Sequence, residues 1–400
     1  MTGEAFDVAV VGAGPAGSAT ARRLAQEGWR VALLERSRFE AARIGESLAP
    51  DVQGAVRELG LWSEFLALRP LPSWGTRSVW GDAEQQSHSH LLSPYGCGWH
   101  VDRRAFDEML ARGAAAAGAT LLQGVEVRHP SYDDGRWRLR TAPAPPEDAD
   151  DAEPGHLSAR VLVDATGRRA RVASSLGARR MRFDRLVGVA VAWAGVDPAE
   201  QGHLLVEAAT DGWWYSAPLP GVAGQEPDRT IAMLMTDSDV CRRQRLSAPE
   251  RWHARVEASP ATWRRLRGAY PDSPPKVHDA HSQRLRRDDV GDATGAGPWL
   301  AVGDAALAVD PISGSGVLRA LRTGRAAAAT VAEVLARPDS WERAVAAYES
   351  DRDEECTTYL FERAQYYAAE GRFDSPFWER RQVLRRLEAA GVATSPSAPG

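Results

Sequence analysis

The chain begins with an apolar run, then a helical pattern, then a second apolar run. Residues 8–11 are all apolar, which is typical of a strand buried on both faces of a parallel sheet. Residues 18–27 have helical spacing, Gly28 ends the helix, and residues 29–34 indicate another strand. This order predicts the first strand–helix–strand unit of a Rossmann-like sheet.

The middle of the chain changes to shorter strand-like segments separated by turns. Between about residues 180 and 280 these segments favour an antiparallel sheet, followed by helices over 248–257 and 261–268. Elsewhere the pattern predicts helices over 51–61, 102–117, 314–336 and 341–370, and strands over 120–129, 136–140, 159–164 and 299–302. A proline-rich acidic turn at 142–156 and a tail at 393–400 are expected to be disordered.

The order of these elements predicts an α/β fold in which one domain is built discontinuously. The Rossmann-like nucleotide-binding domain is expected to take residues 1–70, 100–180 and 285–340. The antiparallel-sheet substrate domain is expected to take residues 71–99 and 181–284, and a C-terminal helical region residues 341–392.

Composition excludes several classes of protein. The 400 residues are 44% hydrophobic with a net charge of −5, which fits a soluble globular protein and gives no reason to expect a nucleic-acid partner. No apolar run approaches the roughly 20 residues of a membrane span, and the first strand begins too early for a signal peptide. Three scattered cysteines have no metal-ligand spacing. We therefore expect a cytoplasmic protein without a membrane segment or a metal site.

Three glycines mark the turn after the first strand. Gly12, Gly14 and Gly17 form G-x-G-x-x-G, in which the first permits a tight turn, the second lets a pyrophosphate approach, and the third lets helix and strand pack closely. Glu35 ends the second strand 23 positions after Gly12, where a carboxylate can accept hydrogen bonds from ribose hydroxyls. Because all parts of the unit are in place, dinucleotide binding is favoured over a glycine-rich turn without a ligand.

A second nucleotide signal follows the strand at 299–302. Asp304, after Gly303, can accept hydrogen bonds from ribityl hydroxyls. Beyond Pro311, Gly314 and Gly316 open a helix whose free amides can face a phosphate or the edge of a flavin ring. Taken alone, this stretch is equally an ordinary loop before a helix.

Together with D-A-T-G-R at 164–168, these motifs resemble the single-domain FAD-dependent monooxygenases, a class that includes aromatic hydroxylases, flavin-dependent halogenases and prenyl reductases. The resemblance covers about residues 5–345 and implies FAD as the cofactor. It also implies that Arg103, in R-x-x-F-D at 103–107, lies against FAD, although an exposed arginine at a helix start would give the same pattern. The FAD-binding residues implied are Gly12, Gly14, Pro15, Ala16, Gly17, Glu35, Arg36, Glu46, Ser47, Arg103, Val125, Ala165, Gly167, Gly303, Asp304, Pro311, Gly314, Ser315 and Gly316.

The resemblance leaves the electron source open between two donors. There is no second G-x-G-x-x-G unit for NAD(P)H, which fits the class. In that class NAD(P)H visits the flavin transiently, or a partner flavin reductase delivers the electrons.

Members of this class differ in the reaction they catalyse. Monooxygenases use O2 to form a flavin C4a-hydroperoxide and transfer its distal oxygen to an electron-rich ring. Halogenases use the same peroxide to oxidise halide, and they carry a lysine soon after the first nucleotide unit and a W-x-W-x-I-P segment. Here residues 213–218 read W-W-Y-S-A-P, and no lysine precedes Lys276. Arginine is no substitute because its guanidinium stays protonated, so a halogenase is kept only as a second possibility.

Three local patterns resemble a narrower group within the class. I-G-E-S-L-A-P (44–50), G-W-W-Y-S-A-P-L-P (212–220) and D-S-P-F-W-E-R-R (374–381) look like flavoprotein monooxygenases that hydroxylate a tryptophan within a partner protein during quinone cofactor biogenesis. The resemblance implies an indole or tryptophan-like substrate, either in a partner protein or as a free or carrier-bound metabolite. A reductase or oxidase of the prenyl reductase type, and a flavin-binding protein without catalysis, stay open as well.

The candidate catalytic residues are Glu46, Trp213, Tyr215 and Pro311. Glu46 is expected beside the isoalloxazine ring, unless it serves as an N-cap or in a salt bridge. Trp213 and Tyr215 share one face of a strand, which either walls a substrate cavity or packs in the core. Pro311 is expected near the reactive edge of the flavin. The helical region from residue 341 either packs on the domain body or, with residues 72–98, forms a docking groove for a protein substrate.

Overall fold

The computed structural model describes residues 4–144, 155–221, 229–287 and 297–385. Most of the acidic turn expected at 142–156, and all of the tail expected at 393–400, lie outside these ranges. Within them, no helix has the length and hydropathy needed to cross a bilayer.

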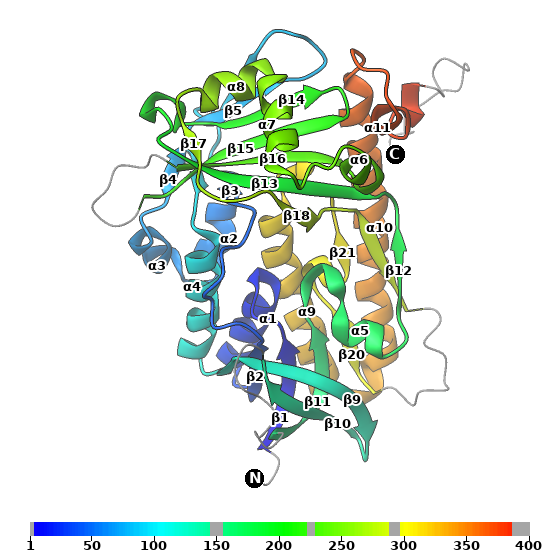
Figure 1. The fold of residues 1–400 in the computed structure, drawn as a ribbon. Helices are drawn as coiled ribbons and strands as arrows, with labels where there is room; N and C mark the ends of the chain where they lie inside the picture. Colours follow the sequence, from blue (N-terminus) through cyan, green and yellow to red (C-terminus); the bar gives the residue numbers. More distant parts are fainter. Residues whose placement is uncertain (1–3, 145–154, 222–228, 288–296, 386–400) are drawn as a thin grey trace.

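A seven-stranded sheet forms the lower half of the molecule in Figure 1. Its order is β8–β2–β1–β11–β10–β9, and β20 also pairs with β11. The strands are β1 (Glu4–Val11), β2 (Val31–Glu35), β8 (Thr120–Gln123), β9 (Val125–Asp133), β10 (Arg136–Pro143), β11 (Gly155–Asp164) and β20 (Trp299–Ala301). β1 is parallel to β2 and to β11, so that Val8 lies opposite Val31 and Val161. This is the Rossmann-like sheet that the first strand–helix–strand pattern predicts.

Helices cover both faces of this sheet. Val8 and Val10 of β1 pack in one core with the helices α1, α4 and α9, whereas Ala9 and Val11 pack in a second core with Trp137 of β10 and with α5. The α-helices within the described residues are α1 (Pro15–Gln26), α2 (Val52–Glu58), α3 (Trp62–Ala67), α4 (Arg103–Ala116), α5 (Arg171–Ser175), α6 (Ser238–Arg243), α7 (Pro249–Glu257), α8 (Pro260–Leu266), α9 (Gly316–Ala336), α10 (Trp341–Ala369) and α11 (Pro376–Glu379).

An eight-stranded sheet forms the upper half. Its order is β17–β13–β16–β15–β14–β5–β6, with β18 also paired with β13. The strands are β5 (Gly75–Val79), β6 (Gln86–Ser89), β13 (Leu186–Ala194), β14 (Leu204–Ala209), β15 (Gly212–Leu219), β16 (Arg229–Asp237), β17 (Tyr270–Pro271) and β18 (Lys276–Asp279). All pairs are antiparallel except β14 with β5, which is parallel.

The two faces of the eight-stranded sheet have different coverings. Trp214 lies on the outer face, in a core with Trp252 of α7 and Leu266 of α8. Trp213 lies on the inner face, in a core with Tyr367 of α10 and with α11. The sheet therefore separates an outer helical layer from the side that faces the seven-stranded sheet.

Two small sheets connect the halves. One has the order β3 (Ser47–Leu48), β7 (Gly98–His100), β4 (Leu71–Ser73), and the other β12 (Arg179–Arg182), β19 (Gln283–Arg286), β21 (Leu307–Ala308). Helix α10 runs beside both halves of the molecule (Figure 1). The α/β architecture with an antiparallel-rich insert and a C-terminal helical region is thus confirmed, while the exact domain boundaries stay a prediction.

The helix expected over 51–61 is wrong in one respect. It ends at Glu58, as α2, because Gly60 adopts φ +67°, the left-handed conformation that ends a helix, and a separate helix, α3, follows at Trp62–Ala67. In the C-terminal region, Tyr348, Tyr359 and Tyr367 are buried. This face of α10 therefore packs on the domain body, as one of the two sequence hypotheses proposed.

Candidate functional site

The glycine turn between β1 and α1 is crowded at two of its three glycines. A Cβ on Gly12, whose φ is +108°, would lie 2.2 Å from the Ala165 carbonyl oxygen, and a Cβ on Gly17 would lie 1.9 Å from the Gly12 oxygen. A Cβ on Gly14 would meet no atom within 4 Å. The first and third glycines are therefore needed for packing, while the second leaves room in front of the amino end of α1, where Pro15 is the first helical residue.

A cleft of about 430 Å³ lies beside this turn. Seven of the residues implied to bind FAD line it: Gly12, Gly14, Glu35, Arg36, Val125, Ala165 and Gly167. The Glu35 carboxylate at its wall accepts a hydrogen bond from the Ala13 N–H at 2.9 Å. A cleft with a helix amino end, an open glycine and a carboxylate at the strand end fits the adenosine diphosphate portion of FAD.

Two arginines meet at a buried carboxylate between Glu35 and the loop at residues 44–47. Asp107 is 2% exposed and accepts hydrogen bonds from Arg43 at 2.8 Å and Arg103 at 3.1 Å. Arg43 also pairs with Glu35 at 3.2 Å, and Arg103 donates to the Gly45 carbonyl at 3.1 Å. With 12% of its side chain exposed, Arg103 is not an exposed arginine at a helix start. Sequence reasoning missed Arg43 and Asp107, although Asp107 ends the R-x-x-F-D motif.

Glu46 is held inside the loop that precedes β3. Its carboxylate is 4% exposed and accepts from the Gly45 N–H at 2.9 Å, and its carbonyl accepts from the Val101 N–H at 2.8 Å. Burial raises the pKa of Glu46 to about 6, although backbone N–H donors and the charge of Arg103 oppose the shift. A carboxyl group with a pKa near neutrality can exchange a proton with a bound molecule.

The structure brings Tyr215 to the same loop. Burial, with the nearby Glu46 carboxylate, holds the pKa of Tyr215 well above its usual range, and the Ser47 backbone opposes this shift. Tyr215 therefore presents a neutral hydroxyl at working pH. Trp213, on the same face of β15, is 1% exposed and donates to the Tyr367 hydroxyl at 3.0 Å. This burial favours a packing role for Trp213.

The segment that contains Gly303 and Asp304 packs against the glycine turn between β1 and α1. A Cβ on Gly303 would lie 2.8 Å from the Ala16 Cβ of α1, so the two motifs share a packed boundary. The Asp304 carboxylate lies 3.3 Å from the Arg168 guanidinium and is about one-third exposed. It can therefore accept a hydrogen bond from a ribityl hydroxyl without losing this partner.

The segment before α9 has open space around its glycines. Gly314 adopts φ +61°, and neither Gly314 nor Gly316 has an atom within 4 Å of its Cβ position. Ser315, between them, is the N-cap residue of α9, and its hydroxyl is hydrogen-bonded to the Ser313 hydroxyl at 3.1 Å. These residues can admit a flat ring close to the backbone.

A buried aspartate fixes the turn that contains Pro311. Asp310 is fully buried, and its carboxylate accepts from the Ile312 N–H at 3.1 Å, the Arg363 Nε at 3.1 Å and the Tyr367 hydroxyl at 2.8 Å. Arg363 is also paired with Asp184 at 3.0 Å. Sequence reasoning missed Asp310, Arg363 and Tyr367, because nothing local marks an aspartate as the partner of residues more than fifty positions away.

An apolar surface lies between these loops and the inner face of the eight-stranded sheet. Ile44 and Ile312 come from the two loops, and Leu204, Val206 and Tyr215 come from β14 and β15. All five belong to one cluster and are only partly buried. They can contact an aromatic ring placed between the candidate flavin site and the sheet.

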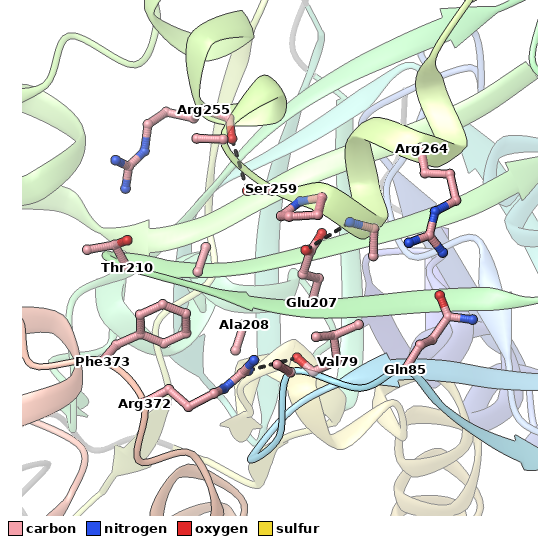
Figure 2. A pocket seen from close by; sticks show the side chains of 15 residues that line it. Val79, Gln85, Glu207, Ala208, Thr210, Arg255, Ser259, Arg264, Arg372 and Phe373 are labelled. Carbon is pink, nitrogen blue, oxygen red and sulfur yellow. Dashed lines mark hydrogen bonds between the residues drawn. The ribbon is translucent and has the colours of Figure 1, made fainter.

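Figure 2 shows a different hollow, of about 290 Å³. Glu207 lies in it and accepts from the backbone N–H groups of Ala261 and Thr262 at 3.0 and 2.7 Å. Glu207 is opposite Trp214 in the sheet, so this hollow is on the outer face. None of the residues predicted from the sequence to form the site lines it.

Lys276 lies on a strand that pairs only with β13 among the described strands, and His100 lies in the small sheet that contains β3. Lys276 is exposed on β18, opposite Ala190 of β13. The imidazole of His100 is fully buried and neither ring nitrogen has a hydrogen-bond partner among the described residues, and burial lowers its pKa to about 3. His100 is therefore uncharged at neutral pH.

Replacing Glu46 with glutamine is expected to stabilise the protein at pH 7.5 but not at pH 4.5. The folded pKa near 6 lies above the ordinary value of 4.5, so the native state binds the proton more tightly and stability falls as pH rises between these values. Glu46→Gln removes this loss, about 2 kcal/mol, and keeps an oxygen for the Gly45 N–H. Urea unfolding of the variant and the wild type at both pH values measures the difference in the free energy of unfolding. Glu84→Gln, at an exposed position, is the control and is expected to change stability little at either pH. An equal effect of Glu46→Gln at both pH values would contradict the raised pKa of Glu46.

Comparisons with known proteins agree with this geometry. A family model described as FAD binding domain matches residues 5–359. LodB of Marinomonas mediterranea, an inferred FAD-dependent oxidoreductase, is 30% identical over 391 residues, which cover 97% of this chain and 100% of LodB. Further similar proteins are a tryptophan 2-halogenase of Chondromyces crocatus and a flavin-dependent halogenase of Armillaria mellea.

Two solved structures are similar over nearly the whole chain. The myxobacterial chondrochloren halogenase CndH has a TM-score of 0.83 and 26% identity, covering 97% of this chain and 88% of its own. QhpG, a peptidyl tryptophan dihydroxylase essential for tryptophylquinone cofactor biogenesis, has a TM-score of 0.66 and 27% identity, covering 94% of this chain and 78% of its own.

Proposed function

The chain belongs to the FAD binding domain family, in its flavin-dependent halogenase and monooxygenase branch, and we propose that it is a monooxygenase that hydroxylates an indole or tryptophan-like ring. The finer proposal is that this ring is a tryptophan side chain of a partner protein and that the reaction serves quinone cofactor biogenesis. The observation that carries the proposal is the partly exposed apolar surface of Ile44, Ile312 and Tyr215, at the boundary between the candidate flavin loops and the sheet.

The residues of the site have separate tasks in this proposal. When bound, FAD supplies the two-electron activation of O2, with NAD(P)H or a partner flavin reductase as the electron donor. One oxygen atom enters the aromatic ring and the other leaves as water. Arg103 and Asp310 hold the two loops that carry Ile44 and Ile312, and these side chains exclude water from the reacting ring. Glu46 is the group in this loop whose pKa suits proton transfer to or from the reacting centre.

Two further observations and one chemical argument support hydroxylation of tryptophan. QhpG acts on a peptidyl tryptophan and is similar over 94% of this chain and 78% of its own. The surface formed by Ile44, Val206 and Ile312 bears no charge, which suits an indole ring. Indole is nucleophilic enough to react without a dedicated base.

Halogenation is the second candidate, because CndH and other halogenases are similar over most of the chain. Two features count against it. The sequence has a single lysine, Lys276, which is exposed on β18 at the sheet. The segment at 213–218 also departs from W-x-W-x-I-P, with Tyr215 and Ala217 at the second tryptophan and isoleucine positions.

Product analysis separates the two candidates. The FAD-loaded protein would be supplied with NADH or NADPH and a flavin reductase, isotopically heavy O2, and either N-acetyl-tryptophanamide or a tryptophan-containing peptide, with and without bromide. We expect an indole product that carries heavy oxygen and is formed equally with and without bromide. Mass spectrometry of the products is the measurement. Lys276→Ala is the matched control and is expected to leave the product yield unchanged.

Two results would overturn the proposal. A brominated product that depends on Lys276 would establish a halogenase. Consumption of NADH without oxygen incorporation into any aromatic probe, but with reduction of an isoprenoid double bond, would establish a reductase of the prenyl reductase type.

A further inference from the structure

We propose that two copies of this chain associate through strand β6. The outer edge of β6 (Gln86–Ser89) of one copy pairs antiparallel with β6 of the other across a two-fold axis, and the apolar side chains that follow β6 cover the joint. This proposal is independent of the reaction that the enzyme catalyses.

β6 is the last strand of the eight-stranded sheet. It pairs with β5 alone, and all four of its residues are exposed. Among the described residues, the backbone of β6 has no strand on its outer side. Exposed edge strands are commonly guarded by lysine, proline or other charged residues, whereas β6 reads Q-S-H-S. Its unpaired N–H and C=O groups can therefore receive another strand.

The segment after β6 exposes large apolar side chains. Leu91 is 77% exposed, Leu92 97% and Tyr95 46%. Trp74, 49% exposed, is adjacent, because its carbonyl accepts from the His90 N–H at 2.8 Å. Isolated exposed leucines need no explanation, but a group of this kind beside an open strand edge marks an interaction surface.

The charge pattern favours a second copy as the occupant. Residues 86–101 contain no Asp, Glu, Lys or Arg, in a chain that is 26% charged and has a net charge of −5. Two like-charged copies repel over most of their surface, and this segment is where they can approach without placing like charges together. In a two-fold contact the same surface meets itself, so it must be complementary to itself. An uncharged strand with apolar neighbours is self-complementary, because it does not need an opposite charge on the partner.

The geometry requires no change in β6. If the axis passes midway between the two copies of Ser87, Ser87 of one copy lies opposite Ser87 of the other, and Gln86 of each copy lies opposite His88 of the other. The two eight-stranded sheets then form one continuous sheet, and Leu91 and Leu92 of each copy lie beside the junction. Antiparallel pairing uses the backbone groups that β5 leaves free.

Mass measurement of the FAD-loaded full chain tests the proposal. Light scattering after size-exclusion chromatography is expected to give twice the chain mass of 43.4 kDa at about 50 µM protein, where a micromolar dimer is formed. Leu92→Asp and Ser87→Lys place charges in the contact and are expected to weaken the dimer at least about 100-fold. Leu66→Asp, at a leucine of α3 that is 46% exposed, is the matched control and is expected to stay dimeric.

The measured masses either support or overturn a dimer formed through β6. A wild-type protein that is monomeric at this concentration overturns the proposal, and so does a dimer that Leu92→Asp leaves intact, because the contact then lies elsewhere. Hydrogen exchange supplies a second readout. The amides of residues 86–89 are expected to exchange more slowly in the wild type than in Leu92→Asp, and equal exchange would exclude the pairing of β6. Unchanged FAD content and circular dichroism show that the variants are folded.

Discussion

Gly14→Glu is expected to abolish FAD binding in a chain that still folds. Gly14 has φ −72°, a backbone conformation open to any residue, and its Cβ position meets no atom within 4 Å. The new carboxylate would occupy the space at the amino end of α1 and repel the pyrophosphate there. We expect FAD affinity to fall at least about 100-fold, which corresponds to about 2.8 kcal/mol. Titration of the FAD-free protein with FAD, followed by flavin fluorescence, measures this affinity.

Two alanine variants separate this effect from damage to the turn. Gly14→Ala adds a methyl group without charge, and we expect FAD affinity within about tenfold of the wild type, or about 1.4 kcal/mol. Gly17→Ala brings a Cβ to 1.9 Å from the Gly12 oxygen, and a thermal unfolding scan should show loss of the native fold. FAD binding by Gly14→Glu at wild-type affinity would mean that the pyrophosphate does not lie at α1.

Asp310→Asn is expected to lower the free energy of unfolding by about 3 kcal/mol, because it breaks an ion pair to Arg363 at a fully buried carboxylate that water cannot replace, even though Arg363 keeps Asp184. The carboxylate accepts from Arg363, Tyr367 and the Ile312 backbone. The asparagine amide has the same size, so no cavity forms and the lost charge is the main change. Urea unfolding of the FAD-free protein at pH 7.5 measures the difference.

Asp353→Asn is the matched control for Asp310→Asn. Asp353 also pairs with a buried arginine, Arg284, at 2.9 Å, but its own side chain is 62% exposed. Water can replace this carboxylate, and Arg284 keeps Glu349, so we expect a loss below about 1 kcal/mol. Equal losses in the free energy of unfolding for the two variants would contradict a larger contribution from the buried Asp310 carboxylate.

Local patterns made part of this site predictable from the sequence. The unit from Gly12 to Glu35 depends on residues close in sequence, whose turn, packing and hydrogen-bonding needs can be judged together. The strand alternation likewise predicted that Trp213 and Tyr215 share one face, which they do.

Features that depend on distant segments could not be predicted in this way. Whether Trp213 is in the core or at a cavity is decided by Tyr367 and α11, which the chain supplies more than 150 positions later. Asp107 has a local partner in Arg103, four residues earlier in α4, but its pairing with Arg43 depends on a segment 64 positions away. Buried ion pairs between remote segments leave no periodic signal in the sequence.

Helix α10 has a consequence for how a large substrate could enter. It is bonded to the seven-stranded sheet through Tyr348 and the Ala301 carbonyl at 2.9 Å, to the Pro311 turn through Asp310, and to the Trp80 side chain after β5 through the Tyr366 carbonyl at 2.8 Å. The two sheets therefore cannot separate like the halves of a hinge without breaking bonds to one rigid helix. If a bulky substrate reaches the apolar surface of Ile44, Ile312 and Tyr215, rearrangement of surface loops and not domain opening would admit it, and the rate of loop motion would limit its entry.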